Sequence, residues 1–190
     1  MAEHKMKPTE TLTPKFRVSF PELYEAKSFK QGKPKFSVQM LFDKKADLSA
    51  LKNIVKVAIK EQWGDNPPKG ITLPFKDGNE KELEGYQDMI VATASTQYKP
   101  QVVDQKGEPI LAHDDVYAGS YARAYIEAYA WEMKEGKSVL KRGVIFNLNM
   151  VQKLSDGERF VKRADASSVF DVVEDSSSTH ADIDEDDFLN

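Results

Sequence analysis

The sequence predicts a mainly β domain, folded as a small barrel or sandwich with a single α-helix. Several short segments alternate apolar with polar residues, which is the pattern of strands that bury one face. Turn signals containing glycine separate these segments, and only one stretch has apolar residues at helical spacing. A series of strands interrupted by one helix is typical of a sheet that closes or packs on itself.

Two strands are expected before the helix. In the first, Phe16, Val18 and Phe20 alternate with polar residues, and Pro21 ends or bends the strand because proline cannot donate a backbone hydrogen bond. The second covers residues 35–43, KFSVQMLFD, where alternate apolar side chains share one face and lysine, serine and glutamine share the other. This second strand is expected to be half-buried, with a polar outer side.

The helix is expected to begin at the N-cap Asp47 and to run to Trp63. Leucine, isoleucine and valine recur at helical spacing from Leu48 onward. Pro67 and Pro68 follow, and proline can neither continue a helix nor donate its hydrogen bond. No second stretch has a comparable pattern.

The rest of the chain is predicted to consist of strands and tight turns. Short segments with glycine indicate turns at 76–79, 104–107 and 134–137. Strands are expected at 89–94, 119–133 and 143–150. In the last of these, the residues expected to face inward are Val144, Phe146, Leu148 and Met150. With the extra hairpins, this order of elements fits an OB-type five-stranded barrel, which often carries a nucleic-acid-binding face.

The longest strand pattern, residues 119–133, has two unlike faces. One face holds alanines and Ile126, which can lie flat on a core. The other consists of Tyr121, Arg123, Tyr125, Glu127, Tyr129 and Trp131. Burying unpaired charges is costly, which favours exposure of this second face, and rings interleaved with a guanidinium suit the stacking of nucleic-acid bases. The alternative is a core strand whose aromatic side chains are buried beside an Arg123–Glu127 pair.

The composition limits the class of protein. A chain of 190 residues suits one domain with appendages. It contains no cysteine, which excludes disulfides, thiolate metal sites and a cysteine nucleophile. There is no apolar run of membrane-spanning length, and the polar N-terminus lacks the apolar core of a signal peptide. We therefore expect a soluble protein that is not exported.

Charge is unevenly distributed along the chain. Residues 171–190 hold eight acidic and no basic side chains, whereas the rest holds 27 basic and 23 acidic ones, a net charge of about +4. This asymmetry indicates nucleic-acid contact by the body, and protein contact or self-masking by the tail; a tail that only aids solubility is the alternative. We expect a flexible arm over 1–15, a folded domain over 16–170 and a disordered acidic tail over 171–190.

Four blocks in the body of the chain carry a family resemblance. They are KPKFSVQMLFDKKAD at 33–47, KDGNEKELEGYQDMIVATASTQYKPQVVD at 76–104, VYAGSYARAYIEAYAW at 116–131 and GVIFNLNMVQKLSDGERF at 143–160. In this order they resemble a family of bacteriophage single-stranded-DNA-binding proteins. The resemblance implies an OB-fold domain that coats single-stranded DNA during phage replication and recombination in the cytoplasm of the infected host. It implies no catalysis and no cofactor.

The end of the tail, DIDEDDFLN, resembles the acidic C-termini of bacterial and phage single-strand binders. Such termini dock on replication partners and compete with DNA for the basic cleft of their own protein. The residues that match are Asp184, Glu185, Asp186, Asp187 and Phe188. The bacterial version ends in Pro-Phe, whereas Leu189 and Asn190 follow the phenylalanine here. Masking of the cleft needs only charge and is not affected by that difference.

The expected DNA-binding residues form two groups. Aromatic side chains would stack on bases, each contributing about 1 to 3 kcal/mol, and basic side chains would neutralise phosphates. The stacking group consists of Tyr98, Tyr121, Tyr125, Tyr129 and Trp131, with Tyr121 and Tyr125 as the first choice. The phosphate group consists of Lys99, Arg123, Lys134, Lys137, Lys141 and Arg142.

Two other classes of function are compatible with the sequence. A metal-dependent nuclease would use Asp114, Asp115 and Glu127, but no catalytic motif accompanies them. His113 precedes the two aspartates, yet these are consecutive residues without a second cluster at ligand spacing, so no metal ligand is assigned. A protein-interaction module would use the aromatic face as a hot spot. A homodimer is also compatible with the sequence.

Overall fold

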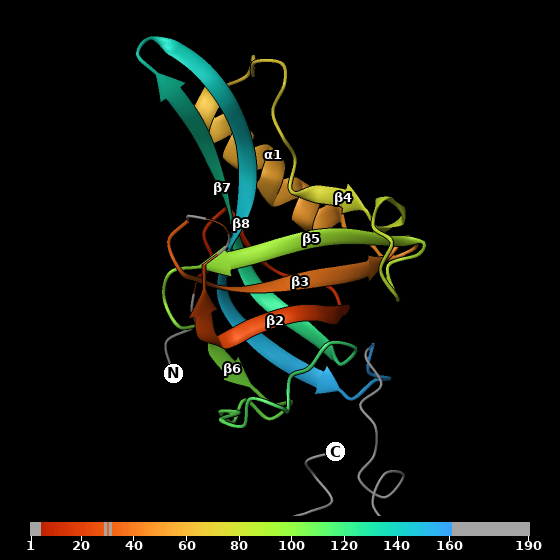
Figure 1. Ribbon diagram of the computed structural model, residues 1–190. Coiled ribbons are helices and arrows are strands. Elements are labelled where there is room, and N and C mark those ends of the chain that lie inside the picture. Colours follow the sequence, from red (N-terminus) through yellow and green to blue (C-terminus); the bar gives the residue numbers. More distant parts are fainter. Residues whose placement is uncertain (1–4, 29, 31, 161–190) are drawn as a thin grey trace, which may run out of the picture.

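A computed structural model describes residues 5–28, 30 and 32–160 of the chain. Figure 1 shows a strand-rich body with one α-helix against it. The elements are β1 (Glu10–Leu12), β2 (Phe16–Lys27), β3 (Lys35–Asp43), α1 (Ser49–Trp63), β4 (Phe75–Asp77), the 3₁₀ helix η1 (Gly78–Glu80), β5 (Met89–Thr96), β6 (Gln101–Val103), β7 (Tyr121–Glu135) and β8 (Ser138–Ser155). The predicted mainly β class with one α-helix is confirmed.

Five strands close into a ring. β7 pairs with β2, β2 with β3, β3 with β5, β5 with β8, and β8 returns to β7. Among these pairs only β5 and β8 run parallel. The short strands extend the sheet outside the ring, because β1 pairs with β7, β4 with β5 and β6 with β8. This closed ring is the OB-type barrel that the sequence predicted.

The interior of the barrel is filled by the apolar faces of its strands. Val38, Met40 and the opposing Ala92 and Ala94 are fully buried, as the alternation predicted. The small residues of β7, which include Ala122 and Ala124, are buried as well. Helix α1 covers one part of this core with its own apolar stripe: Leu51, Ile54, Val55 and Ala58. Burial of each large side chain contributes about 1.5 to 3 kcal/mol relative to exposure.

The start of the helix differs by one residue from the expectation, and the bend of the first strand at Pro21 is one of the two outcomes that were expected. α1 begins at Ser49 and its N-cap position is Leu48, so the prediction of Asp47 as N-cap is off by one residue. Asp47 instead accepts a hydrogen bond from the backbone N–H of Ser49 at 2.9 Å. Pro21 bends β2 rather than ending it, since Phe20 has a positive φ of 42° and the register with β3 shifts there.

A β-bulge in β8 corrects one inward-facing prediction. Tyr125 pairs with Met150 and Ile126 pairs with Leu148, which leaves Asn149 without an opposite residue. The extra residue shifts the alternation by one position. Val151 is therefore buried, whereas Met150 is 42% exposed and does not face inward.

The N-terminal segment is also different from the expectation. Residues 1–15 were predicted to form a separate flexible arm, but residues 9–13 belong to the sheet. Thr13 accepts a hydrogen bond from the N–H of Ala124 at 2.9 Å, and the carbonyl of Thr9 accepts one from Ala128 at 2.8 Å. Strand β1 thereby lies beside β7 in the sheet, with Leu12 opposite Tyr125. The predicted disordered tail, residues 171–190, lies outside the described residues.

The β7–β8 hairpin extends past the barrel beside α1 (Figure 1). Its turn consists of Gly136 and Lys137, within the segment where the sequence predicted it. Gly136 has a φ of 58°, a conformation that glycine adopts at little cost. Trp63 at the end of α1 donates its indole N–H to Glu132 at 2.7 Å, which ties the hairpin to the helix.

Candidate nucleic-acid interface

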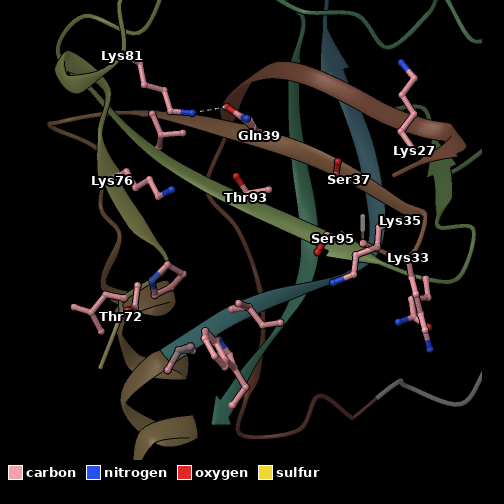
Figure 2. A pocket seen from close by; sticks show the side chains of 18 residues that line it. Lys27, Lys33, Lys35, Ser37, Gln39, Thr72, Lys76, Lys81, Thr93 and Ser95 are labelled. Carbon is pink, nitrogen blue, oxygen red and sulfur yellow. Dashed lines mark hydrogen bonds between the residues drawn. The ribbon is translucent and has the colours of Figure 1, made fainter. Parts of the chain in front are cut away.

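A groove of about 1000 Å³ crosses the outer face of β3 and β5. Its floor consists of small polar side chains that alternate along these strands with the core residues. The register places Ser37 opposite Ser95 and Gln39 opposite Thr93, so the four side chains lie together on one surface (Figure 2). A floor of short side chains leaves room for a ligand to approach the sheet closely.

Lysines line both sides of the groove. Figure 2 shows Lys76 and Lys81 at one side of the floor and Lys27, Lys33 and Lys35 at the other. Lys27 forms a 2.7 Å ion pair with Glu22, whereas Lys33, Lys35 and Lys76 have no carboxylate partner among the described residues. The groove has no acidic residue in its described lining. Its electrostatic field therefore favours an anionic ligand.

One end of the groove is apolar. Trp131 of β7 lies there with Leu73, Pro74 and Ile145, and Leu73 and Ile145 are half-exposed. Tyr129, which is 61% exposed, pairs with Ile145 across the β7–β8 ladder and extends this apolar surface on the same face.

The position of the Trp131 indole depends on Gly143. Gly143 is paired with Trp131, and a Cβ at this position would lie 2.9 Å from the carbonyl oxygen of Thr72 and 3.2 Å from the indole nitrogen. Thr72 is hydrogen-bonded to β8 on both sides of this glycine, through Arg142 and Val144. The absence of a side chain at Gly143 therefore lets Trp131 and the segment around Thr72 meet at the end of the groove.

A buried hydrogen-bond chain leads from the core to the groove floor. Ser19 and Tyr86, which are 2% and 1% exposed, are joined at 2.8 Å through their hydroxyls. The Tyr86 hydroxyl lies 2.7 Å from Oε1 of Gln39, and Nζ of Lys81 lies 3.5 Å from the same oxygen. Burial raises the pKa of Tyr86, so its hydroxyl stays protonated and can donate.

The sequence prediction found part of this groove. Of the residues assigned to DNA binding, Trp131 lines the groove and Tyr129 adjoins it. Tyr121 lies elsewhere on the outer face of β7, where Lys15 and Arg17 stand 5.2 and 5.8 Å from the centre of its ring. Arg123 is exposed but donates to Gln152 at 2.7 Å.

Tyr125 is not available for stacking. It is 9% exposed because β1 pairs with this part of β7, with Leu12 opposite Tyr125. Burial raises the pKa of the Tyr125 hydroxyl, and a hydrogen bond to Glu10 contributes to the shift. The expectation that this ring lies on an exposed face is therefore wrong. The cause is the N-terminal segment, which the sequence analysis treated as a free arm.

The other predicted basic and aromatic residues lie away from the groove lining. Tyr98 is 83% exposed in the loop after β5, and Lys99 lines a separate hollow. Lys134 forms a 3.1 Å ion pair with Glu132 within β7. The remaining hairpin residues are Lys137, Lys141 and Arg142, and they do not line the groove. Their role in DNA binding stays a prediction.

The predicted site was built around the aromatic residues of 119–133, and it therefore did not include the groove lysines or the polar floor. The signal was present in KQGKPKFSVQ, where a lysine-rich turn leads directly into a strand whose outward positions are small and polar. Lys76 and Lys81 reach the same groove only because β4 pairs with β5. That pairing cannot be read from local pattern.

Glu127, one of the carboxylates considered for a nuclease, and the loop histidine His113 are both engaged in other contacts. Glu127 accepts hydrogen bonds from Thr9 and Lys7, both at 3.2 Å. His113 stacks on Tyr24 with ring centres 4.5 Å apart. Within residues 5–28, 30 and 32–160 no group of three or more His, Cys, Asp or Glu side chains could hold a metal ion. No helix in the same part of the chain is long and apolar enough to cross a membrane.

Comparison with known proteins decides the family. The sequence model of the Enterobacter phage Enc34 single-stranded-DNA-binding protein matches residues 9–188. The chain belongs to this family. The resemblance predicted from the sequence blocks is thus confirmed, and the family is one of DNA-binding proteins rather than enzymes.

Members and structural neighbours come from several phages. The putative protein p50 of Acyrthosiphon pisum secondary endosymbiont phage 1 is 33% identical over an alignment of 159 residues, and the match covers 76% of this chain and 82% of that protein. The fold is similar to the single-stranded DNA-binding protein from bacteriophage Enc34 in complex with ssDNA. That comparison has a TM-score of 0.71 at 20% identity and covers 82% of this chain and 91% of the other. The fold is also similar to gp2.5, a single-stranded DNA-binding protein encoded by bacteriophage T7. That comparison has a TM-score of 0.56 at 13% identity and covers 90% of this chain and 98% of the other.

Proposed function

We propose that this chain binds single-stranded DNA in the groove on β3 and β5, and that it protects the strand during phage replication and recombination in the host cytoplasm. The observation that carries this proposal is the lining of the groove. In its described lining, five lysines and no acidic residue surround a floor of small polar side chains, and the partly buried Trp131 lies at one end. Family membership and the fold of the neighbours support the same function.

The chemistry of the groove suits a single strand without strong sequence preference. Every nucleotide carries a phosphate, which a lysine can neutralise. The counterions released from the DNA by this neutralisation make the binding free energy more favourable. Trp131 and Tyr129 can stack only on bases whose faces are free, which a duplex does not offer. The same groove gives no catalytic group to attack the strand, so binding rather than cleavage follows from it.

A titration with labelled oligonucleotides tests this function. Fluorescence anisotropy is expected to show binding of oligo-dT far tighter than binding of a duplex of equal length. The tryptophan fluorescence is expected to fall on addition of oligo-dT, because a base stacks on Trp131. A protein-interaction module, the alternative function, should bind neither form, and that outcome would reject DNA binding by this chain.

The described part of the chain ends beside the groove. Phe160, the last described residue, packs on the small cluster of Leu41, Tyr86 and Val91, and its N–H donates to the carbonyl of Ala118 at 3.2 Å. Val91 itself lines the groove. Ten residues of sequence after Phe160 comes the tail, residues 171–190, which carries eight acidic side chains. We propose that it competes with DNA for the groove, and that Asp184–Phe188 dock replication or recombination proteins.

Deletion of residues 171–190 is expected to tighten binding of oligo-dT several-fold at low salt. The reason is that the deletion removes a competing anion held at high local concentration. The difference should shrink as salt screens the tail from the lysines. Anisotropy titrations at several salt concentrations measure both effects. A full-length variant with neutral amides in place of the eight acids is the matched control, because it keeps the chain length; unchanged affinity in both variants would contradict self-masking. Light scattering on the full-length protein tests whether the chain forms the homodimer that its sequence allows.

A further inference from the structure

The side chain of Gln39 is held in one orientation at the floor of the groove. Both Tyr86 and Lys81 lie within hydrogen-bond distance of its oxygen, at 2.7 and 3.5 Å. A lysine ammonium can only donate, so the atom facing it must be the amide oxygen and not the amide nitrogen. Figure 2 shows this oxygen on the side of Lys81 and the nitrogen on the far side. The ammonium of Lys81 therefore fixes the orientation of the amide.

The hydrogen-bond chain behind Gln39 is compatible with this orientation. With the amide oxygen toward it, Tyr86 donates to Gln39 and accepts from Ser19. Both hydroxyls are buried and each can donate or accept, so the chain alone would also accept a turned amide. The Lys81 ammonium excludes that alternative, because the amide nitrogen would then face a second donor. The Gln39 nitrogen has no hydrogen-bond partner among the described residues, and this side chain lines the groove.

Gln39 consequently acts toward a ligand as a donor only. A free glutamine can contact adenine through its oxygen and nitrogen together, by accepting from N6 and donating to N7. Here the oxygen is already used, so that paired contact is not available. What the groove offers at this point is the amide N–H₂ group, which matches a carbonyl oxygen and not an exocyclic amino group.

The position of Gln39 determines which edge of a base reaches it. The lysines stand along the sides of the groove and hold the phosphates, whereas Gln39 lies on the floor between Ser37 and Lys81 (Figure 2). A base that enters from the backbone side points the atoms farthest from its sugar toward the floor. In a pyrimidine this is the substituent at C4, which is a carbonyl in thymine and an amino group in cytosine.

We propose that Gln39 is a base-reading residue, whose amide donates to the keto oxygen of a thymine or guanine and disfavours the amino group of cytosine or adenine. The inference rests on the proposed binding of single-stranded DNA in this groove. It adds a mild keto preference to a site that otherwise reads only phosphates and ring faces. A keto base and an amino base differ by one net hydrogen bond to Gln39, so their affinities should differ roughly two- to tenfold.

Oligo-dT and oligo-dC of equal length provide the test, because both are pyrimidine strands and differ at C4. The full-length protein is expected to bind oligo-dT roughly two- to tenfold more tightly at mildly alkaline pH. Gln39→Met, which removes the amide at similar size, should bring the affinity ratio to about one. Gln39→Glu offers only acceptors and should turn the ratio toward oligo-dC, since a carboxylate accepts from the cytosine amino group.

Two further variants separate reading from packing. Lys81→Met removes the ammonium that requires the Gln39 oxygen to face it, so the amide can turn and the ratio should fall although Gln39 is intact. Gln97→Met changes a second glutamine of the groove lining and should leave the ratio unchanged. Equal affinity of the wild type for the two oligonucleotides, or an unchanged ratio in Gln39→Met, would overturn the inference. Failure of the proposed function would look different, because neither oligonucleotide would bind.

Discussion

Replacement of Lys33, Lys35 and Lys76 together by alanine is expected to weaken binding of oligo-dT roughly a hundredfold near 0.1 M salt. These three lysines line the groove without a carboxylate partner in the described part of the chain, so their charge is available to phosphates. Each neutralised phosphate of a single strand adds about 0.7 to the slope of log affinity against log salt. Anisotropy titrations over a range of salt should therefore show the slope reduced by about 2.

Helix α1 provides the matched control for this experiment. Lys52, Lys56 and Lys60 are exposed on the helix and do not line the groove. Their triple replacement by alanine removes the same charge from the protein and should change the slope little. If both triple variants lose affinity and slope equally, net charge rather than the groove attracts the DNA. The groove would then not be the binding site.

Local pattern was enough to predict the strands, the helix and the class of fold, because each depends on the alternation of neighbouring residues. Residues 35–40 alternate apolar with polar side chains, and β3 has the predicted bounds 35–43. The parallel pairing of β5 with β8 and the bulge at Asn149 depend on contacts between distant segments. One extra residue in β8 reversed the direction of Met150, which no local pattern indicates.

The site was harder to predict than the fold for the same physical reason. On the aromatic face of 119–133 the ring of Tyr129 is exposed, Tyr121 and Trp131 are partly buried, and Tyr129 and Trp131 lie at or next to the groove. A strand pattern cannot show which part of a face another segment covers. Strand β1 covers Tyr125, and the groove lysines come from segments that meet only in the folded sheet.

Trp131→Ala is expected to weaken binding of oligo-dT about 5- to 150-fold, the effect of losing one stacked base at about 1 to 3 kcal/mol. The indole stands at the apolar end of the groove, where Gly143 leaves space beside it. Trp131→Phe keeps a ring that can stack and should lose less. Because no charge is removed, the dependence of affinity on salt should stay as in the wild type, in contrast to the lysine variant. Anisotropy titrations over the same salt range measure both quantities.

Tyr125→Phe separates stacking from the stability of strand β7. The ring of Tyr125 is buried under β1, and its hydroxyl bonds to Glu10. This variant should lower the free energy of unfolding in urea by about 1 kcal/mol, through the lost hydrogen bond, and leave the affinity for oligo-dT unchanged. The opposite result, a loss of affinity in Tyr125→Phe with Trp131→Ala unaffected, would place the DNA on the β1 side of β7. Since the two residues lie on the same face of one strand, this pair of variants decides which part of that face the DNA reaches.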